Sequence, residues 1–133
     1  MTILNDEGRE YTLSHLEEAQ IASDPLIQFG SWIQEALDAN LKDATAMTLS
    51  TVSDNEVSSR MVLLKSYDER GLVFFTNYSS PKAKALEKHP QASLQFWWSD
   101  FERQLRVQGI ASKISPEESD EYFSKRDKES NIA

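Results

Sequence analysis

Residues 60–65 read Arg60-Met-Val-Leu-Leu-Lys65, residues 71–77 read Gly71-Leu-Val-Phe-Phe-Thr-Asn77, and residues 79–84 read Ser79-Ser-Pro-Lys-Ala-Lys84. The first two runs are apolar, rich in strand-forming residues, and end in polar or basic side chains. The third begins like a helix, because Ser80 suits the N-cap and Pro81 suits the first helical position. This stretch therefore predicts two strands that lead directly into a helix.

Lys82 falls in the first turn of that predicted helix. Four backbone N–H groups lack partners in such a turn, and the helix dipole is positive there. A lysine opposes the dipole unless an anion fills the space between them, so Lys82 is a candidate phosphate ligand. Lysines also open many helices as solvated surface residues. The spacing alone leaves both interpretations open.

The size and charge of the chain limit its function. Its 133 residues suit one domain with a real core. A net charge of −8 argues against a nucleic-acid or anionic-membrane partner, because no basic field exists to release counterions. Basic residues that gather along the predicted strands favour a small anionic ligand instead. They are Arg60, Lys65, Lys82, Lys84, Arg103 and Arg106.

Other classes of site lack the residues they need. The chain has no cysteine, which excludes disulfides, thiolate nucleophiles and cysteine-based metal sites. The two histidines, His15 and His89, are not spaced as a metal pair, so we expect no metal. Neither a signal peptide nor a membrane span is visible, and we expect a cytoplasmic protein.

The remaining pattern predicts an antiparallel sheet with flanking helices. A helix should begin at Asp24-Pro25 and end near Asn40, with an apolar face that includes Trp32. Strands are expected at residues 46–52, 57–67, 72–77, 92–98 and 102–114, with helices at 81–88 and from Ser115-Pro116 onward. Tight turns between short strands favour a small β-barrel in a mainly β, α+β fold. We expect residues 1–23 to be a flexible segment and residues 24–133 to form the domain.

Tyr122, Arg126 and Ser130 lie on the last predicted helix at positions i, i+4 and i+8. They share one face if the helix persists that far. The simplest interpretation from spacing is an ordinary solvated face.

Five blocks of sequence, taken together, closely resemble the pyridoxine/pyridoxamine 5′-phosphate oxidase family. They are residues 60–65, 74–77, 79–83, 102–109 and 122–126. The blocks occur in the same order as in the family, and the resemblance extends over the sequence from about Asp24 onward. The resemblance implies an FMN-binding split β-barrel that forms a homodimer with FMN at the subunit interface. It also implies a flavoprotein oxidoreductase of pyridoxal phosphate biosynthesis, which oxidises pyridoxamine or pyridoxine 5′-phosphate to pyridoxal 5′-phosphate with O₂ and forms H₂O₂.

The resemblance also assigns site residues. Those implied to bind FMN are Arg60, Met61, Val62, Leu63, Leu64, Lys65, Phe75, Thr76, Ser80, Lys82 and Gln104. Those implied to bind the substrate are Lys65, Tyr122, Arg126 and Ser130. No catalytic side chain is expected, because the cofactor carries the chemistry. The assignment of Tyr122, Arg126 and Ser130 to the substrate phosphate replaces the solvated-face interpretation.

Two features of the implied site need explanation. Arg60 and Lys65 would face opposite ways in a regular strand, so we expect either a bulge or contact with two different ligands. Phe75 and Pro81 stand where the family carries tyrosine and arginine. Losing the arginine removes a charge-assisted hydrogen bond, which could weaken affinity by roughly 1.5–3 kcal/mol.

The family continues beyond the last matching block, through a tryptophan and a Ser-Gln-Ser segment to Trp-Gly-Gly and Arg-x-His-x-Arg motifs. None of these is present in the 133 residues. Besides the oxidase, the sequence therefore leaves open a non-catalytic module that binds FMN or pyridoxal phosphate. A fragment that dimerises and binds nothing well is a third possibility.

Overall fold

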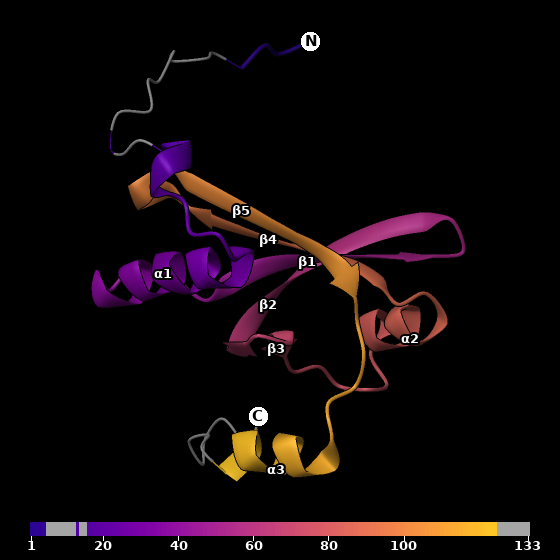
Figure 1. The fold of residues 1–133 in the computed structure, drawn as a ribbon. Coiled ribbons are helices and arrows are strands. Elements are labelled where there is room, and N and C mark those ends of the chain that lie inside the picture. Colours follow the sequence, from indigo (N-terminus) through magenta and orange to yellow (C-terminus); the bar gives the residue numbers. More distant parts are fainter. Residues whose placement is uncertain (5–12, 14–15, 125–133) are drawn as a thin grey trace.

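The computed structural model describes residues 1–4, 13 and 16–124 of the chain. Its helices are η1 (Glu18–Gln20), α1 (Pro25–Asp38), α2 (Pro81–Lys88), η2 (Ser99–Phe101) and α3 (Pro116–Ser124). Its strands are β1 (Ala46–Ser53), β2 (Glu56–Asp68), β3 (Gly71–Phe74), β4 (Gln91–Trp98) and β5 (Arg103–Ile110). Figure 1 shows α1 along one side of the sheet, α2 beside the β1–β2 hairpin, and α3 at the end of a connector below the sheet.

The five strands form an antiparallel sheet in the order β3-β2-β1-β4-β5. The β1–β2 hairpin turns at Asp54 and Asn55, which both adopt the left-handed conformation that two-residue hairpin turns favour. The long strand β2 pairs with β1 over its first part and with β3 over its last part. Among the described residues no pairing joins β3 to β5. The predicted antiparallel α+β class is confirmed: the five strands form a curled half-barrel, with β3 and β5 at its edges in the described part of the chain.

Helix α1 covers one face of the sheet and completes the core. Asp24 caps it by accepting a hydrogen bond from the Leu26 backbone N–H at 2.9 Å, and Pro25 occupies the first position, as predicted. Its buried face packs against inward-facing side chains of β1, β2 and β4. The buried core residues of this cluster are Phe29, Ile33, Ala36, Ala44, Met47, Leu49, Val62, Leu64, Leu94, Phe96 and Trp98.

Two strands are shorter than the sequence pattern predicts. Strand β3 ends at Phe74 rather than residue 77, because Asn77 forms a turn in which its side chain accepts hydrogen bonds from both the backbone and the hydroxyl of Ser79. Strand β5 ends at Ile110 rather than residue 114. Its partner β4 begins at Gln91, and the last contact is from the Ala111 N–H to the Pro90 carbonyl. Pairing therefore stops where the partner strand stops.

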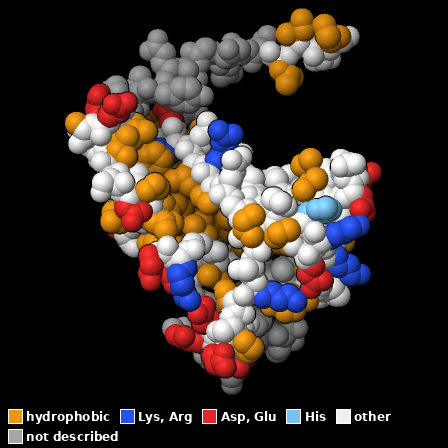
Figure 2. All heavy atoms as spheres, turned by 45° about the vertical axis from the view of Figure 1, so that its right-hand side comes forward, with side chains coloured by type: hydrophobic (Ala, Val, Ile, Leu, Met, Phe, Trp, Pro, Cys, Tyr) orange, Lys and Arg blue, Asp and Glu red, His pale blue; other side chains and the backbone are white. Residues whose placement is uncertain are grey.

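Hydrophobic side chains remain exposed on the surface. Figure 2 shows a broad area of them at the middle of the visible face, with basic side chains to its right. Within the described part of the chain, no helix has both the length and the apolar character needed to cross a membrane.

Candidate functional site

The Arg60–Lys65 segment of β2 divides its side chains between the two faces of the sheet. Val62 and Leu64 face the core and are only 8% and 7% exposed, whereas Met61 and Leu63 face outward at 62% and 47%. Alternation along a strand accounts for this division. Of the apolar residues predicted here to bind FMN, only Met61 and Leu63 thus present side chains to a ligand. Val62 and Leu64 have only backbone groups to offer.

Arg60 shares the inward face of the sheet and is half-buried. Its guanidinium donates hydrogen bonds to Thr51 Oγ1 at 2.8 Å, to the Leu49 carbonyl at 3.3 Å and to Ser58 Oγ at 2.7 Å. All three acceptors are neutral. The arginine is therefore held in place, and its positive charge is not balanced by any carboxylate among the described residues.

A β-bulge lies at Lys65. The pairing of β2 with β3 shifts between Leu64 and Ser66, so Lys65 is the extra residue. Beyond the bulge Tyr67 contacts α1, with its ring 5.1 Å from that of Phe29. A bulge was one of the two explanations offered for the opposite phases of Arg60 and Lys65, and the structure contains one at Lys65. This bulge brings the exposed Lys65 to the wall of a cavity of about 200 Å³ that α1 also lines.

The outward face of the sheet is built from cross-strand rows. One row runs Met61, Thr48, Gln95, Arg106, and a neighbouring row pairs Trp97 with Gln104. Gln95 donates a hydrogen bond to Gln104 Oε1 at 3.0 Å, and Thr48 donates to Met61 Sδ at 3.2 Å. Gln104 is therefore held by a neighbouring amide on this face. Gln95 was not predicted from sequence, and Arg106 was noted only among the basic residues that favour an anionic ligand, although the alternation of both with more buried neighbours indicates the same face.

The start of α2 matches the sequence prediction closely. Ser80 is the N-cap and accepts a hydrogen bond from the Ala83 N–H at 3.3 Å, and its hydroxyl also lies 3.1 Å from that of Thr76. Pro81 occupies the first position and Lys82 follows, half-buried. Phe75 lies between the end of β3 and this turn, and it is also half-buried. The local structure therefore brings Thr76, Ser80 and Lys82 together at one helix N-terminus.

Partial burial without a carboxylate partner distinguishes Arg60 and Lys82 from the other described basic residues. Among the described residues, three lysines or arginines are partly buried: Arg60, Lys82 and Arg103. Arg103 forms an ion pair with Glu35 at 2.7 Å and lies over the Trp32 ring at 4.7 Å, so its charge is used within the fold. Arg60 and Lys82 have no such carboxylate in this part of the chain.

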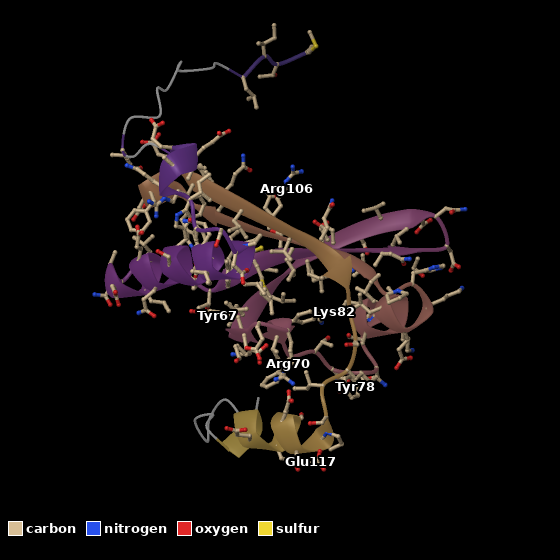
Figure 3. The ribbon with its side chains drawn as sticks, viewed as in Figure 1. Tyr67, Arg70, Tyr78, Lys82, Arg106 and Glu117 are labelled. Carbon is tan, nitrogen blue, oxygen red and sulfur yellow. The ribbon has the colours of Figure 1, made fainter. Side chains whose placement is uncertain are left out.

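Helix α3 begins at a capped turn and is tied to the sheet. Ser115 accepts a hydrogen bond from the Glu118 N–H at 3.2 Å, and the Glu118 carboxylate pairs with Arg70 at 2.8 Å. Figure 3 shows Arg70 between the sheet and this helix. Tyr122 falls within α3. Arg126 and Ser130 lie outside the described residues.

A larger cavity lies elsewhere and was not foreseen. It measures about 620 Å³, and its walls come from η1, α1 and the start of β5. Gln104, Arg103 and Trp32 are among the residues that line it. One wall is formed by residues 16–22. The helical periodicity of this segment is too weak to predict its position from the sequence. Gln104 thus stands between this cavity and the outward face of the sheet.

Comparison with known proteins identifies the relatives of this chain. A family model described as pyridoxamine 5′-phosphate oxidase matches residues 33–133. The pyridoxine/pyridoxamine 5′-phosphate oxidase of Burkholderia lata is 50% identical over 127 residues, which are 95% of this chain and 59% of that protein. The enzyme of the same name from Gloeothece citriformis is 48% identical over 128 residues, with coverage of 96% and 60%. The chain thus spans about 60% of the length of these curated relatives.

Solved structures agree on the fold. PhzG from Burkholderia lata, in complex with tetrahydrophenazine-1-carboxylic acid, superposes with a TM-score of 0.77 at 26% identity, covering 82% of this chain and 55% of that one. A pyridoxamine 5′-phosphate oxidase-related, FMN binding protein from Nostoc punctiforme gives a TM-score of 0.59 at 20% identity, with coverage of 72% and 53%. The predicted split-barrel fold is confirmed.

Proposed function

Because the chain belongs to the pyridoxamine 5′-phosphate oxidase family, we propose that it binds FMN and oxidises pyridoxamine or pyridoxine 5′-phosphate to pyridoxal 5′-phosphate. The observation that carries this proposal is the half-buried Lys82 at the capped start of α2, with no carboxylate partner among the described residues. A partly buried cation is costly without a counter-charge. A phosphate group supplies that charge.

The residues present fit the phosphate end of FMN. Backbone N–H groups at a helix N-terminus favour an anion, and the Thr76 and Ser80 hydroxyls can each donate a hydrogen bond. Lys82 supplies a full positive charge. Pro81 stands where the family has an arginine, so the site relies on fewer charged donors than its relatives use.

The outward face of the sheet fits the ring end of FMN. Met61 and Leu63 offer apolar surface, and the amide of Gln104 can pair with polar atoms at a ring edge. The hydrogen bond from Gln95 fixes the Gln104 carbonyl, which leaves its NH₂ group to donate to a ligand. Arg60 and Lys65 add positive charge along the same strand, although the Arg60 side chain lies on the inward face.

The substrate would be held through its own phosphate. Tyr122, Arg126 and Ser130 provide a phenol, a guanidinium and a hydroxyl, which suit a phosphate ester. Bound FMN supplies the redox chemistry, which is removal of a hydride from C4′ of the substrate, with O₂ as final acceptor and H₂O₂ as product. The protein's own contribution is to hold two phosphorylated rings in a reactive orientation.

We propose further that the active form is a homodimer. Met61, Leu63 and Trp97 are large hydrophobic residues, and each is about half exposed or more on the outward face. Exposed apolar area of this kind is common at interfaces between subunits. A second copy would cover such residues and enclose a ligand bound against them.

A non-catalytic FMN-binding or pyridoxal-phosphate-binding module is the second candidate. This candidate is favoured by the length of the chain, which spans about 60% of the length of its curated relatives. The PhzG structure also shows that one protein of this fold binds a tricyclic carboxylic acid. Identity to the B6-phosphate oxidases is 47–50%, against 26% for PhzG, which favours a B6 phosphate as the ligand here.

The first experiment is the visible spectrum of the purified protein, recorded before and after incubation with excess FMN and desalting. Retained flavin absorbance is expected, and a colourless protein would contradict the FMN proposal. Pyridoxamine 5′-phosphate is then added under air and H₂O₂ is measured. Production of H₂O₂ supports the oxidase, whereas retained flavin without H₂O₂ favours the binding module.

A further inference from the structure

Arg70 connects the tip of the β2–β3 hairpin to helix α3. Its Nη1 atom lies 2.8 Å from Glu118 Oε1, across 48 positions of sequence. The hairpin turn comprises Asp68, Glu69, Arg70 and Gly71. The contact therefore joins an edge strand of the sheet to a helix that Figure 1 shows at the end of a connector.

Asp68 holds the Arg70 side chain in place. Its Oδ1 accepts the Arg70 backbone N–H at 2.8 Å, and its Oδ2 accepts from Nε at 3.1 Å and from Nη2 at 2.8 Å. The planar guanidinium is thereby oriented before it meets α3, which reduces the entropy lost in forming the second contact. The remaining donor group, at Nη1, is the one that contacts Glu118.

Glu118 lies one helical turn before Tyr122, the predicted substrate residue that falls within α3. Arg126 and Ser130, the other two predicted substrate residues of this segment, lie outside the described residues. Residues four apart on a helix lie nearly above one another. The backbone N–H of Glu118 is also held by Ser115. Fixing Glu118 therefore fixes the rotation of the α3 turn that leads to Tyr122.

We propose that Arg70, oriented by Asp68, is a positioning residue that sets the rotation of α3 and hence the direction of the helix face on which Glu118 and Tyr122 lie. Arg70 acts through Glu118 and does not itself bind the substrate. The positioning role in substrate binding rests on the proposed function, whereas the contact between Arg70 and α3 does not. These two parts can be tested separately.

The first test measures hydrogen exchange of the amides in residues 116–124. Arg70→Ala and Glu118→Gln should each speed exchange roughly two- to five-fold, the range expected for an exposed ion pair. The double variant should match the single variants, because both remove the same contact. Lys88→Ala is the matched control, since it breaks an exposed ion pair of 2.6 Å with Asp54 that does not involve α3. Unchanged exchange in Arg70→Ala would overturn the inference, whatever the protein binds.

The second test uses pyridoxal 5′-phosphate as a probe of the FMN-loaded protein. Arg70→Ala should raise its dissociation constant roughly two- to five-fold and leave the FMN constant unchanged. Faster α3 exchange with unchanged affinity for pyridoxal 5′-phosphate would overturn the positioning role. A wild-type protein that retains FMN but does not bind the probe would count against the proposed substrate, and hydrogen exchange would still decide the Arg70 contact.

Discussion

Replacing Lys82 with alanine tests the phosphate site most directly. The change removes the charged donor from the first turn of α2 and leaves the Ser80 cap and Pro81 in place. A charge-assisted hydrogen bond contributes about 1.5–3 kcal/mol, and each 1.4 kcal/mol is a tenfold change in affinity. We therefore expect the FMN dissociation constant to rise about 10- to 150-fold. The lower part of that range is expected, because Lys82 is only half-buried.

The same substitution should have the opposite effect on the protein without FMN. A lysine near a helix N-terminus opposes the helix dipole, by about 0.3–1 kcal/mol at an exposed position. Its removal should leave the free energy of unfolding unchanged or slightly raise it. Weaker FMN binding would then have to come from a lost ligand contact and not from a damaged helix.

Lys84→Ala is the matched control for this experiment. Lys84 lies two residues further along α2 and is exposed, and alanine replaces the same side chain in the same helix. Fluorescence titration with FMN measures both variants, and urea unfolding without FMN measures their stability. Equal FMN affinities for the two variants would refute the assignment of Lys82 to the phosphate.

Three further predictions follow from the same structure. Hydrogen bonds from Arg70 hold the pKa of Asp68 below its usual value, so the stabilisation they give is complete above about pH 4 and is lost as pH falls through the lowered pKa. Asp68→Asn should therefore lower the Tm at pH 7 and have little effect near pH 2; an equal loss at both values would contradict this. Phe96→Ala removes a fully buried ring that packs against Phe29. The free energy of unfolding in urea should fall by about 3–5 kcal/mol, and a fall below 1 kcal/mol would mean that the core is misplaced. Arg126→Ala should raise the apparent substrate constant while FMN stays bound, and loss of flavin instead would mean that the two phosphate sites are exchanged.

Local chemistry made much of the fold predictable from sequence. Asp24 with Pro25, and Ser80 with Pro81, marked helix starts that the structure reproduces. Each of these signals acts through its own neighbours, so no knowledge of distant residues was needed. The end of β3 was placed too late because the turn at Asn77 was not recognised in the sequence. The end of β5 was placed too late because strand length depends on the partner strand, and pairing partners are not visible in the local pattern.

The candidate site was predictable only where the side chain's partner lies nearby in sequence. Arg103 was grouped with the basic residues that favour an anionic ligand, but its charge is neutralised by Glu35, which lies 68 residues away in the sequence. The conflicting phases of Arg60 and Lys65 predicted either a bulge or contact with two different ligands, and the position of the bulge at Lys65 came from the pairing of β2 with β3. Its effect on Tyr67 and α1 required the tertiary structure. Arg70 drew no attention from sequence, because its contact with Glu118 spans 48 positions.

The distribution of charge gives the strongest physical reason to expect an anion at this site. The chain carries 22 acidic residues against 14 lysines and arginines, so carboxylates are abundant. Four described cations, Arg70, Lys88, Arg103 and Lys113, pair with them. Arg60 and Lys82 do not, although both are partly buried and would gain most from a partner. Arg60 is compensated by three neutral acceptors. Lys82 has no such acceptor among the described residues, so a bound phosphate is the simplest source of its missing counter-charge, and FMN affinity should depend more on Lys82 than on the exposed Lys84.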